Sequence, residues 1–364
     1  MEMNLSFDDI LLKPADWTSI KSRAEVFTES IIFEDRNTKY YLNLPMISSN
    51  MDTVYSPNLS KAVITNGGMS AVHRFCDIDE NIKLFKGGVV RNFAGENVVK
   101  PWVSVGVSPE ELKRCEALVA AGAETVIIDL ANAANDQAAA MFNEIKHWKD
   151  ICKVVVGNFA TKEQIKAFQY HTNNHPFIAK VSIGSGSACT TRLNTGIGVP
   201  SFSCLQDCVK SGVPIIFDGG IKNGGDFAKA LAAGASAVMV GRLFAACEES
   251  PGEIVPGNES WFNIGPTPQP YPHNIKYKKY RGSASAESYE VQGKTAAHRG
   301  PEGESFLIPV SGTVEKLMNN FNGWLRSSMT QCDARNLSEL RENAEFIRVS
   351  DSSKVENSAY GKNS

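Results

Sequence analysis

The sequence predicts an α/β protein whose fold class is a (β/α)8 TIM barrel with a mobile flap after the eighth strand. Eight short runs rich in β-branched residues alternate with stretches of helical periodicity over about 250 residues, the pattern of parallel barrels. Near residue 250 the composition changes, because Gly, Pro, Ser and Lys dominate up to residue 300 and no periodicity persists. A long stretch of this kind after the last strand would lie over the barrel mouth, which predicts a flap.

The eight runs are predicted as barrel strands at residues 45–50, 68–75, 102–107, 125–131, 153–160, 177–184, 214–220 and 235–244. Between them, 108–123 and 223–235 carry apolar residues at i, i+3 and i+4, with glycine near the end as a helix C-cap signal. A doubly wound sheet is the rival fold. It would need a Gly-x-Gly-x-x-Gly loop directly after an early strand, and the sequence has none there.

A single catalytic domain is predicted for 1–350, with the flap at about 250–305 and a polar tail at 351–364. A further helix is predicted at 312–329, after the flap. Only residues 76–101 separate the second and third strands, which is too short for an inserted domain.

Composition excludes several classes of protein. The chain has 364 residues, 42% of them apolar, and a net charge of −3, so it should be globular, with no electrostatic attraction to nucleic acid or an anionic membrane. No run approaches the ~20 apolar residues of a membrane span, and the N-terminus lacks a signal-peptide pattern. Eight scattered cysteines indicate reduced thiols in a cytoplasmic protein. Cys204 and Cys208, at helical spacing, are expected to pack in the core.

Polar and glycine residues cluster where the predicted strands end. Active sites of parallel barrels lie at the carboxyl ends of the strands, so this placement predicts an enzyme. The residues concerned are Asn50, Met51, Asp52, His73, Arg74, Asp129, Asn132, the loop 182–192, Asp218, Gly219, Gly220, Gly241 and Arg242.

The loop after the sixth strand reads "SIGSGSACTTR", Ser182 to Arg192. Its glycines would let a ligand approach the backbone, and Cys189 in such a loop is predicted to be a nucleophile. The alternative is a buried cysteine in a tight turn. Carbonyl oxygens of Gly184, Gly186 and Cys189 could also bind a monovalent cation such as K⁺.

Three further candidates lie in loops. The turn Asp218-Gly219-Gly220 and the pair Gly241-Arg242 follow strands seven and eight, where barrels often bind phosphate, and a carboxylate suits a ribose diol. Both could also be ordinary turns. Glu302 in the flap could contact a purine edge or relay a proton, or it could be an exposed loop glutamate.

Several segments together identify a resemblance. "SFDDILLKPADWTSIKSRAEV", "PMISSNMDTV", "AVHRF", "GSGSACTTRLNTGIGVPSFS", "FDGGIKNGGDFAKALAAGASAVMVGRLFA" and "EESPGE" are similar to signatures of the IMP dehydrogenase/GMP reductase family, over nearly the whole chain. The resemblance implies that Cys189 attacks C2 of a purine nucleotide and holds it covalently while hydride moves between C2 and a nicotinamide. It also implies a homotetramer.

The reductase branch of the family fits best. The chain lacks the inserted CBS repeats of many dehydrogenases, and it contains no Arg-Tyr dipeptide, which dehydrogenases use to activate water. "YRGSASAES", "HRGPEG" and "WLRSSMTQCDARNLSELRENAEFIRV" also resemble reductase segments. The expected reaction is NADPH-dependent deamination of GMP to IMP. The alternatives are an NAD-dependent IMP dehydrogenase without CBS repeats, a reductase of a deoxy or modified purine nucleotide, and a non-catalytic purine-nucleotide-binding relative.

The resemblance also implies residue roles. Cys189 is the nucleophile, and Thr191 with Glu302 relays the proton for departing ammonia. The nucleotide site comprises Asp218, Gly219, Gly220, Gly241, Arg242, Gly282, Ser283, Ala284, Arg299, Gly300, Pro301 and Gly303. Contacts to the cofactor NADPH are implied for Ser22, Arg23, Arg74, Asp129, Ala131, Ile183, Ser327, Ser328, Met329 and Thr330, partly across a subunit interface.

The chain departs from the family's pattern in three places. Ser182 stands where glycine is usual, and Ser185 stands where proline is usual. The loop after the fourth strand reads "ANAAN" in place of "ANG", and the proline-rich stretch 255–272 is longer than expected. These departures leave the exact purine open.

Overall fold

The computed structural model describes residues 4–34, 39–91, 98–256, 261–262, 269–270, 275–291 and 300–354. Eight parallel strands form a closed barrel in which the eighth, β13, pairs with the first, β4. Each predicted strand segment contains one of them, so the fold class is confirmed. The strands are β4 (Met46–Ser48), β5 (Met69–Val72), β8 (Trp102–Val105), β9 (Thr125–Asp129), β10 (Lys153–Phe159), β11 (Ile178–Val181), β12 (Ile215–Asp218) and β13 (Ala237–Val240).

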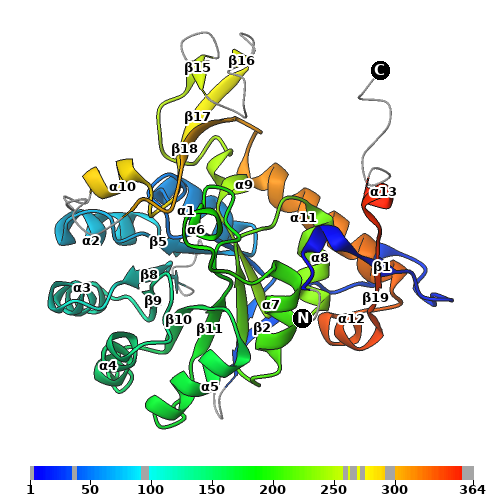
Figure 1. Cartoon of the computed structure of the whole chain (residues 1–364), viewed down its shortest axis with the longest axis horizontal. Helices are drawn as coiled ribbons and strands as arrows, with labels where there is room; N and C mark the ends of the chain where they lie inside the picture. Colours follow the sequence, from blue (N-terminus) through cyan, green and yellow to red (C-terminus); the bar gives the residue numbers. More distant parts are fainter. Residues whose placement is uncertain are drawn as a thin grey trace.

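Helices between the strands surround the barrel (Figure 1). Most begin at a Ser, Thr, Asp or Asn whose side chain accepts a backbone N–H of the first turn, which stabilises the helix start. They are α1 (Pro57–Thr65), α2 (Ile78–Gly87), α3 (Pro109–Ala120), α4 (Asp136–Ile145), α5 (Lys162–His171), α6 (Thr191–Thr195), α7 (Ser201–Val209), α8 (Gly224–Ala232) and α9 (Arg242–Ala245). Cys204 and Cys208 are buried on α7, as expected.

The helix predicted at 312–329 is α11 (Val314–Gln331). It packs against α8 and α1 and takes the outer position that the four-residue α9 leaves open. The rings of Phe321 and Phe227 meet edge-on at 5.6 Å, which anchors α11 on α8. Helix α12 (Leu337–Asn343) follows it.

The barrel interior is filled by alternate residues of the strands, as the two-residue period of a strand requires. These side chains form one buried cluster that includes Ile47, Trp102, Ile127 and Ile216. Ile32 and Leu42, from the hairpin of β2 (Ser30–Glu34) and β3 (Lys39–Leu42), join the same cluster. Because Tyr40 of β3 packs beside Trp102 and Lys153, the first residues of β8 and β10, the hairpin closes the amino-terminal end.

The chain ends meet outside the barrel. Strand β1 (Ile10–Lys13) pairs antiparallel with β19 (Glu345–Arg348). Short 3-10 turns, η1 (Phe7–Asp9) and η2 (Arg23–Glu25), flank β1. The first residues of the predicted tail form α13 (Asp351–Lys354), where Lys354 contacts Asp9 at 2.6 Å. Residues 355–364 lie outside the described residues.

The predicted flap contains regular structure where it is described. Strand β17 (Lys276–Arg281) pairs with β14 (Val255–Pro256) and β18 (Ser305–Pro309), and α10 (Ala286–Val291) follows β17. Further short ladders join β15 (Trp261–Phe262) with β16 (Gln269–Pro270), and β6 (Val90–Arg91) with β7 (Val98–Val99). Flap mobility stays a prediction, and most of 255–272 lies outside the described residues.

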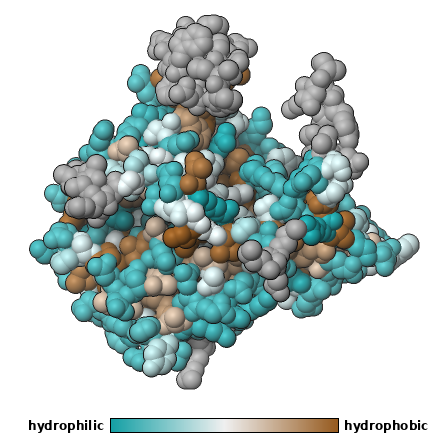
Figure 2. All heavy atoms as spheres, viewed as in Figure 1, coloured by the Kyte–Doolittle hydropathy of each residue, from teal (hydrophilic) through white to brown (hydrophobic). Residues whose placement is uncertain are grey.

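The surface in Figure 2 is mainly hydrophilic, and its hydrophobic residues form small separate groups. Scattered exposure of this kind is usual for globular proteins. Within the described ranges, none of the helices has both the length and the apolar character needed to cross a membrane.

A buried lysine joins the flap sheet to the barrel. Lys278 of β17 donates hydrogen bonds to the carbonyl oxygens of Cys247, Glu248 and Ser250 at 2.7–3.0 Å, and its residue is only 2% exposed. Burial lowers the pKa of Lys278. Its ammonium thereby holds β17 against the segment that follows α9.

We expect Lys278→Met to leave these carbonyls without a donor and to cost about 1–3 kcal/mol. The loss should be local, so amide hydrogen exchange should accelerate in β17 and β18 but not in the barrel strands. Lys279→Met, at the half-exposed neighbouring position, is the control. Equal acceleration throughout the barrel would contradict this role.

Candidate active site

The predicted site residues converge at the carboxyl ends of the barrel strands. Asp129 ends β9 and Asp218 ends β12, Gly241 directly follows β13, and Asn50 and Arg74 lie two residues after β4 and β5. A cavity of about 530 Å³ reaches from the Asp218 turn to Arg242, and a second of about 520 Å³ contains Arg74 and Asp129. A smaller pocket with Cys189 adjoins both.

The cysteine loop and the flap are held together by backbone hydrogen bonds. Thr190 N–H donates to the carbonyl of Glu302 at 2.8 Å, and Glu304 N–H donates to the carbonyl of Ala188 at 2.9 Å. Cys189 lies opposite Gly303 between these bonds. The flap segment therefore fixes the height of Cys189 above the barrel.

Three predicted catalytic side chains form one hydrogen-bonded row. The Sγ of Cys189 lies 3.1 Å from the Oγ1 of Thr191, which donates to the carboxylate of Glu302 at 2.8 Å. Thr191 stands at the start of α6, and Glu302 comes from the flap. Such a row gives a proton a path between the carboxylate and the space beside the thiol.

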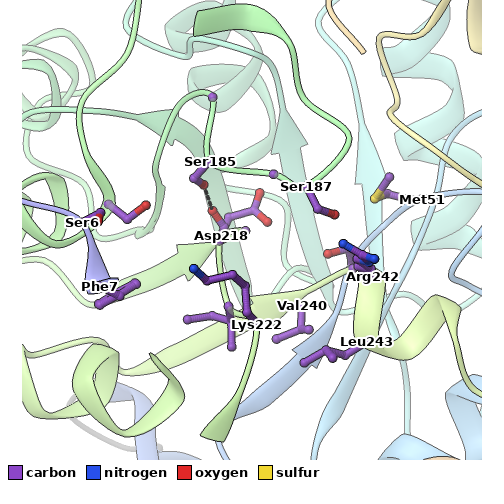
Figure 3. Close-up of a pocket in the computed structure, with 18 of the residues that line it drawn as sticks. Ser6, Phe7, Met51, Ser185, Ser187, Asp218, Lys222, Val240, Arg242 and Leu243 are labelled. Carbon is purple, nitrogen blue, oxygen red and sulfur yellow. Dashed lines mark hydrogen bonds between the residues drawn. The ribbon is translucent and has the colours of Figure 1, made fainter. Parts of the chain in front are cut away.

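The turn after β12 has the backbone that phosphate and ribose contacts need. Gly219 and Gly220 have φ values of +79° and +73°, which glycine adopts without steric cost. Figure 3 shows Asp218 beside Ser185, with Ser187 and Arg242 across the same cavity. Arg242 is exposed and has no ion pair among the described residues, so its guanidinium is available to an anion.

A buried lysine underlies the site. The Nζ of Lys180, a residue 2% exposed, lies 2.9 Å from Asp129 Oδ1 and 2.7 Å from Asp218 Oδ2. It also donates to Asn158, whose amide donates to Asp218 at 3.2 Å. Burial alone would lower the pKa of Lys180, but the two carboxylates outweigh it and raise that pKa.

Neighbouring charges also shift the pKa of Asp129, the carboxylate at the end of β9. Burial alone would raise the pKa of Asp129, but Lys180, Arg74 and a hydrogen bond from Asn50 outweigh it, so the pKa lies below its usual value. Asp129 is therefore ionised at neutral pH. Arg74 Nε, close by, is buried and has no hydrogen-bond partner among the described residues.

The predicted cofactor residues fall into two groups. Arg74, Asp129, Ala131 and Ile183 line the cavities beside Cys189. The second group lies on the far side of the barrel, around α11, where Arg326 donates to the carbonyl of Arg23 at 3.0 Å. This group comprises Ser22, Arg23, Ser327, Ser328, Met329 and Thr330.

Only some of the flap residues predicted to bind a nucleotide lie beside Cys189. Gly282, Ser283 and Ala284 line the pocket with Cys189, and Gly303 approaches Ala188 closely. Gly300 and Pro301 are exposed. Arg299 lies outside the described residues.

Arg281 is the last residue of β17. Its guanidinium contacts Asp52, after β4, and Glu287 of α10 at 2.9 Å. Burial alone would lower its pKa, but these carboxylates outweigh it and raise that pKa. Arg281 is thus a structural cation and a poor proton acceptor.

Sequence reasoning missed three residues here. Lys180 interrupts an otherwise apolar strand, a signal of a buried charge with partners that was available in the sequence. Tyr280, 3% exposed, lines the cavity between the Asp218 turn and Arg242, and burial raises its pKa. Asn158 gave no sequence signal, because its partner Asp218 comes from a distant segment.

The predicted cation ligands lie in one loop. Gly184 has φ +79°, and the carbonyl of Gly186 already accepts the N–H of Cys189 at 3.0 Å. A carbonyl oxygen has a second lone pair, so this bond leaves room for a cation.

Comparisons with known proteins agree with this geometry. A sequence model described as IMP dehydrogenase / GMP reductase domain matches residues 4–360. GMP reductase of Vibrio vulnificus is 31% identical over 99% of this chain and 98% of its own length. Inosine-5'-monophosphate dehydrogenase of Nitrosopumilus maritimus is 28% identical over 95% and 96%. A solved GMP reductase of Trypanosoma brucei, in complex with guanosine 5'-monophosphate, shares the fold with a TM-score of 0.83 at 22% identity, covering 99% of this chain and 98% of its own.

We expect Lys180→Met to lower the free energy of unfolding by about 3 kcal/mol, the lower end for a broken buried ion pair, because it leaves two carboxylates, 19% and 20% exposed, without their cation. The folded pKa of Asp129 is lowered in the wild type, so its contribution is present above the unfolded pKa and lost at more acid pH. The variant's deficit should therefore shrink as pH falls and the carboxyls protonate. Urea unfolding at pH 7 and pH 4.5 measures both effects.

Proposed function

Because this chain belongs to the IMP dehydrogenase/GMP reductase family of oxidoreductases, we propose that it is a GMP reductase. It would convert GMP, NADPH and two protons to IMP, NADP⁺ and ammonium. The observation that carries the proposal is the row Cys189–Thr191–Glu302, which places a thiol beside a path for protons. The relatives named GMP reductase, aligned over almost their whole length, support it.

In this proposal the Cys189 sulfur bonds to C2 of the guanine base. The bond from C2 to the exocyclic nitrogen breaks, and a proton passes from Glu302 through Thr191 to the leaving amine. NADPH, when bound, supplies a hydride to C2. The carbon–sulfur bond then breaks, its electron pair returns to Cys189, and IMP leaves.

The nucleotide would be held by the loops described above. Asp218 would bind the ribose hydroxyls through Oδ1, because Lys180 and Asn158 occupy Oδ2. The N–H groups of the glycine turn and the guanidinium of Arg242 would bind the phosphate. The remaining members of this proposed set are Gly219, Gly220, Gly241, Gly282, Ser283, Ala284, Arg299, Gly300, Pro301 and Gly303.

The residues beside Cys189 fit a nicotinamide. The cavity with Arg74 and Asp129 adjoins the thiol, and the guanidinium of Arg74 would contact an amide or phosphate oxygen of the cofactor. The second predicted group lies across the barrel, so it would serve a cofactor held by a neighbouring subunit of a homotetramer. We also propose K⁺ at the carbonyls of Gly184, Gly186 and Cys189.

An NAD-dependent IMP dehydrogenase is the second candidate, and the Nitrosopumilus relative favours it. That reaction needs a base to activate water. Arg281 is paired with Asp52 and Glu287, and no arginine in the chain precedes a tyrosine. These observations favour the reductase.

Purified protein should oxidise NADPH in the presence of GMP, followed at 340 nm, and form little XMP from IMP and NAD⁺. Absence of a general base typically costs on the order of 10²–10⁴ in rate, which is the expected gap between the two reactions. XMP formation at a rate equal to or above GMP reduction would establish the dehydrogenase.

Cys189→Ala should abolish turnover but retain GMP binding by calorimetry, because the phosphate and ribose contacts come from other loops. Glu302→Gln should lower kcat by about 10²-fold or more, since an amide cannot pass on a proton. Cys152→Ala and Glu304→Gln, at exposed positions, are the matched controls. Retention of a tenth of the activity by Cys189→Ala would exclude covalent catalysis.

A further inference from the structure

The cysteine loop begins with a residue in an unfavourable conformation. Ser182 has φ +103° and is 2% exposed. A side chain with a Cβ rarely adopts this backbone, which glycine reaches freely. A buried residue keeps such a conformation only where the surrounding contacts impose it, and such positions gather at functional sites.

Those contacts include a chain of hydroxyl groups. Ser182 Oγ donates to Ser185 Oγ at 2.6 Å. Ser185 Oγ in turn donates to the backbone carbonyl of Asp218 at 3.0 Å, the dashed line in Figure 3. The carbonyl of Ser182 also accepts the side-chain amide of Asn158 at 2.7 Å. The start of the cysteine loop is thus bonded to the turn that carries Asp218.

The loop and the turn also touch directly. A Cβ added at Gly219 would lie 2.9 Å from Ser185 Oγ and 3.2 Å from the backbone nitrogen of Gly186, closer than ordinary contact. No side chain fits between the two segments. A shift of the turn would therefore move the loop with it.

We propose that Ser182 and Ser185 are positioning residues that lock the cysteine loop onto the Asp218 turn. A nucleotide held by the turn then meets Cys189 at a fixed height, although neither serine touches a reacting atom. The inference rests on the proposed function, since it takes Asp218 to hold the nucleotide. Where the family usually has glycine and proline, this chain uses a hydroxyl pair.

Kinetics of four variants test the lock. Ser185→Ala should lower kcat about tenfold and change KM for GMP less than about threefold, because the binding groups stay in place. The double variant of Ser182→Ala and Ser185→Ala should be no slower than the slower single variant, because the two hydroxyls form one chain. Ser182→Gly should be faster than Ser182→Ala, because glycine adopts φ +103° without strain.

A second readout needs no substrate. Alkylation of Cys189 by iodoacetamide, followed by mass spectrometry of its peptide, should be at least about threefold faster in Ser185→Ala, because a released loop exposes the half-buried thiol. If the wild type fails to oxidise NADPH with GMP, the proposed function fails, and alkylation alone decides the lock.

The matched control is Ser70→Ala. Ser70 and Ser48 share a hydroxyl hydrogen bond of 2.6 Å inside the barrel, away from the loop. Its loss should lower Tm but leave kcat and Cys189 alkylation unchanged. Additive losses in the double variant, effects of Ser185→Ala within about twofold of wild type, or equal effects of Ser70→Ala would each overturn the proposal.

Discussion

The buried ammonium of Lys180 is the interaction on which the site depends. Lys180 lies on β11, the barrel strand next to β12, and its Nζ contacts the carboxylates at the ends of β9 and β12. Removing three charges from water is costly, so the arrangement persists only because the cation is shared and Asn158 completes its hydrogen bonds. The pKa of Asp129 therefore stays below its usual value, and both carboxylates are fixed in direction.

The barrel makes that arrangement available. Its parallel strands bring their carboxyl ends to one rim, while the hairpin of β2 and β3 closes the other end with Ile32 and Leu42. Polar groups on separate loops then line adjoining cavities. The flap adds a second wall, because its backbone bonds to the cysteine loop on both sides of Cys189.

The two ends of the space that these cavities form differ in charge and in backbone geometry. Arg242 and the glycine turn offer positive charge and N–H groups at one end, and Arg74 and Asp129 lie at the other. The thiol stands between them. Arg281, in contrast, forms ion pairs with Asp52 and Glu287, and the pair with Asp52 ties the flap to the barrel rim. Because its guanidinium is paired in this way, Arg281 is a poor proton acceptor.

The sequence by itself determined the barrel and its strand positions, because periodicity is a local signal, and its glycine-rich loop singled out Cys189 as a predicted nucleophile. The roles predicted for Thr191 and Glu302 together rest on the family resemblance. Only the tertiary structure joined Glu302 to Thr191 and decided that Lys180 bridges Asp129 and Asp218. It also showed that β17 and β18 order part of the flap. These contacts link residues far apart in the chain, and their geometry is set by closure of the barrel and by burial, which no local pattern records.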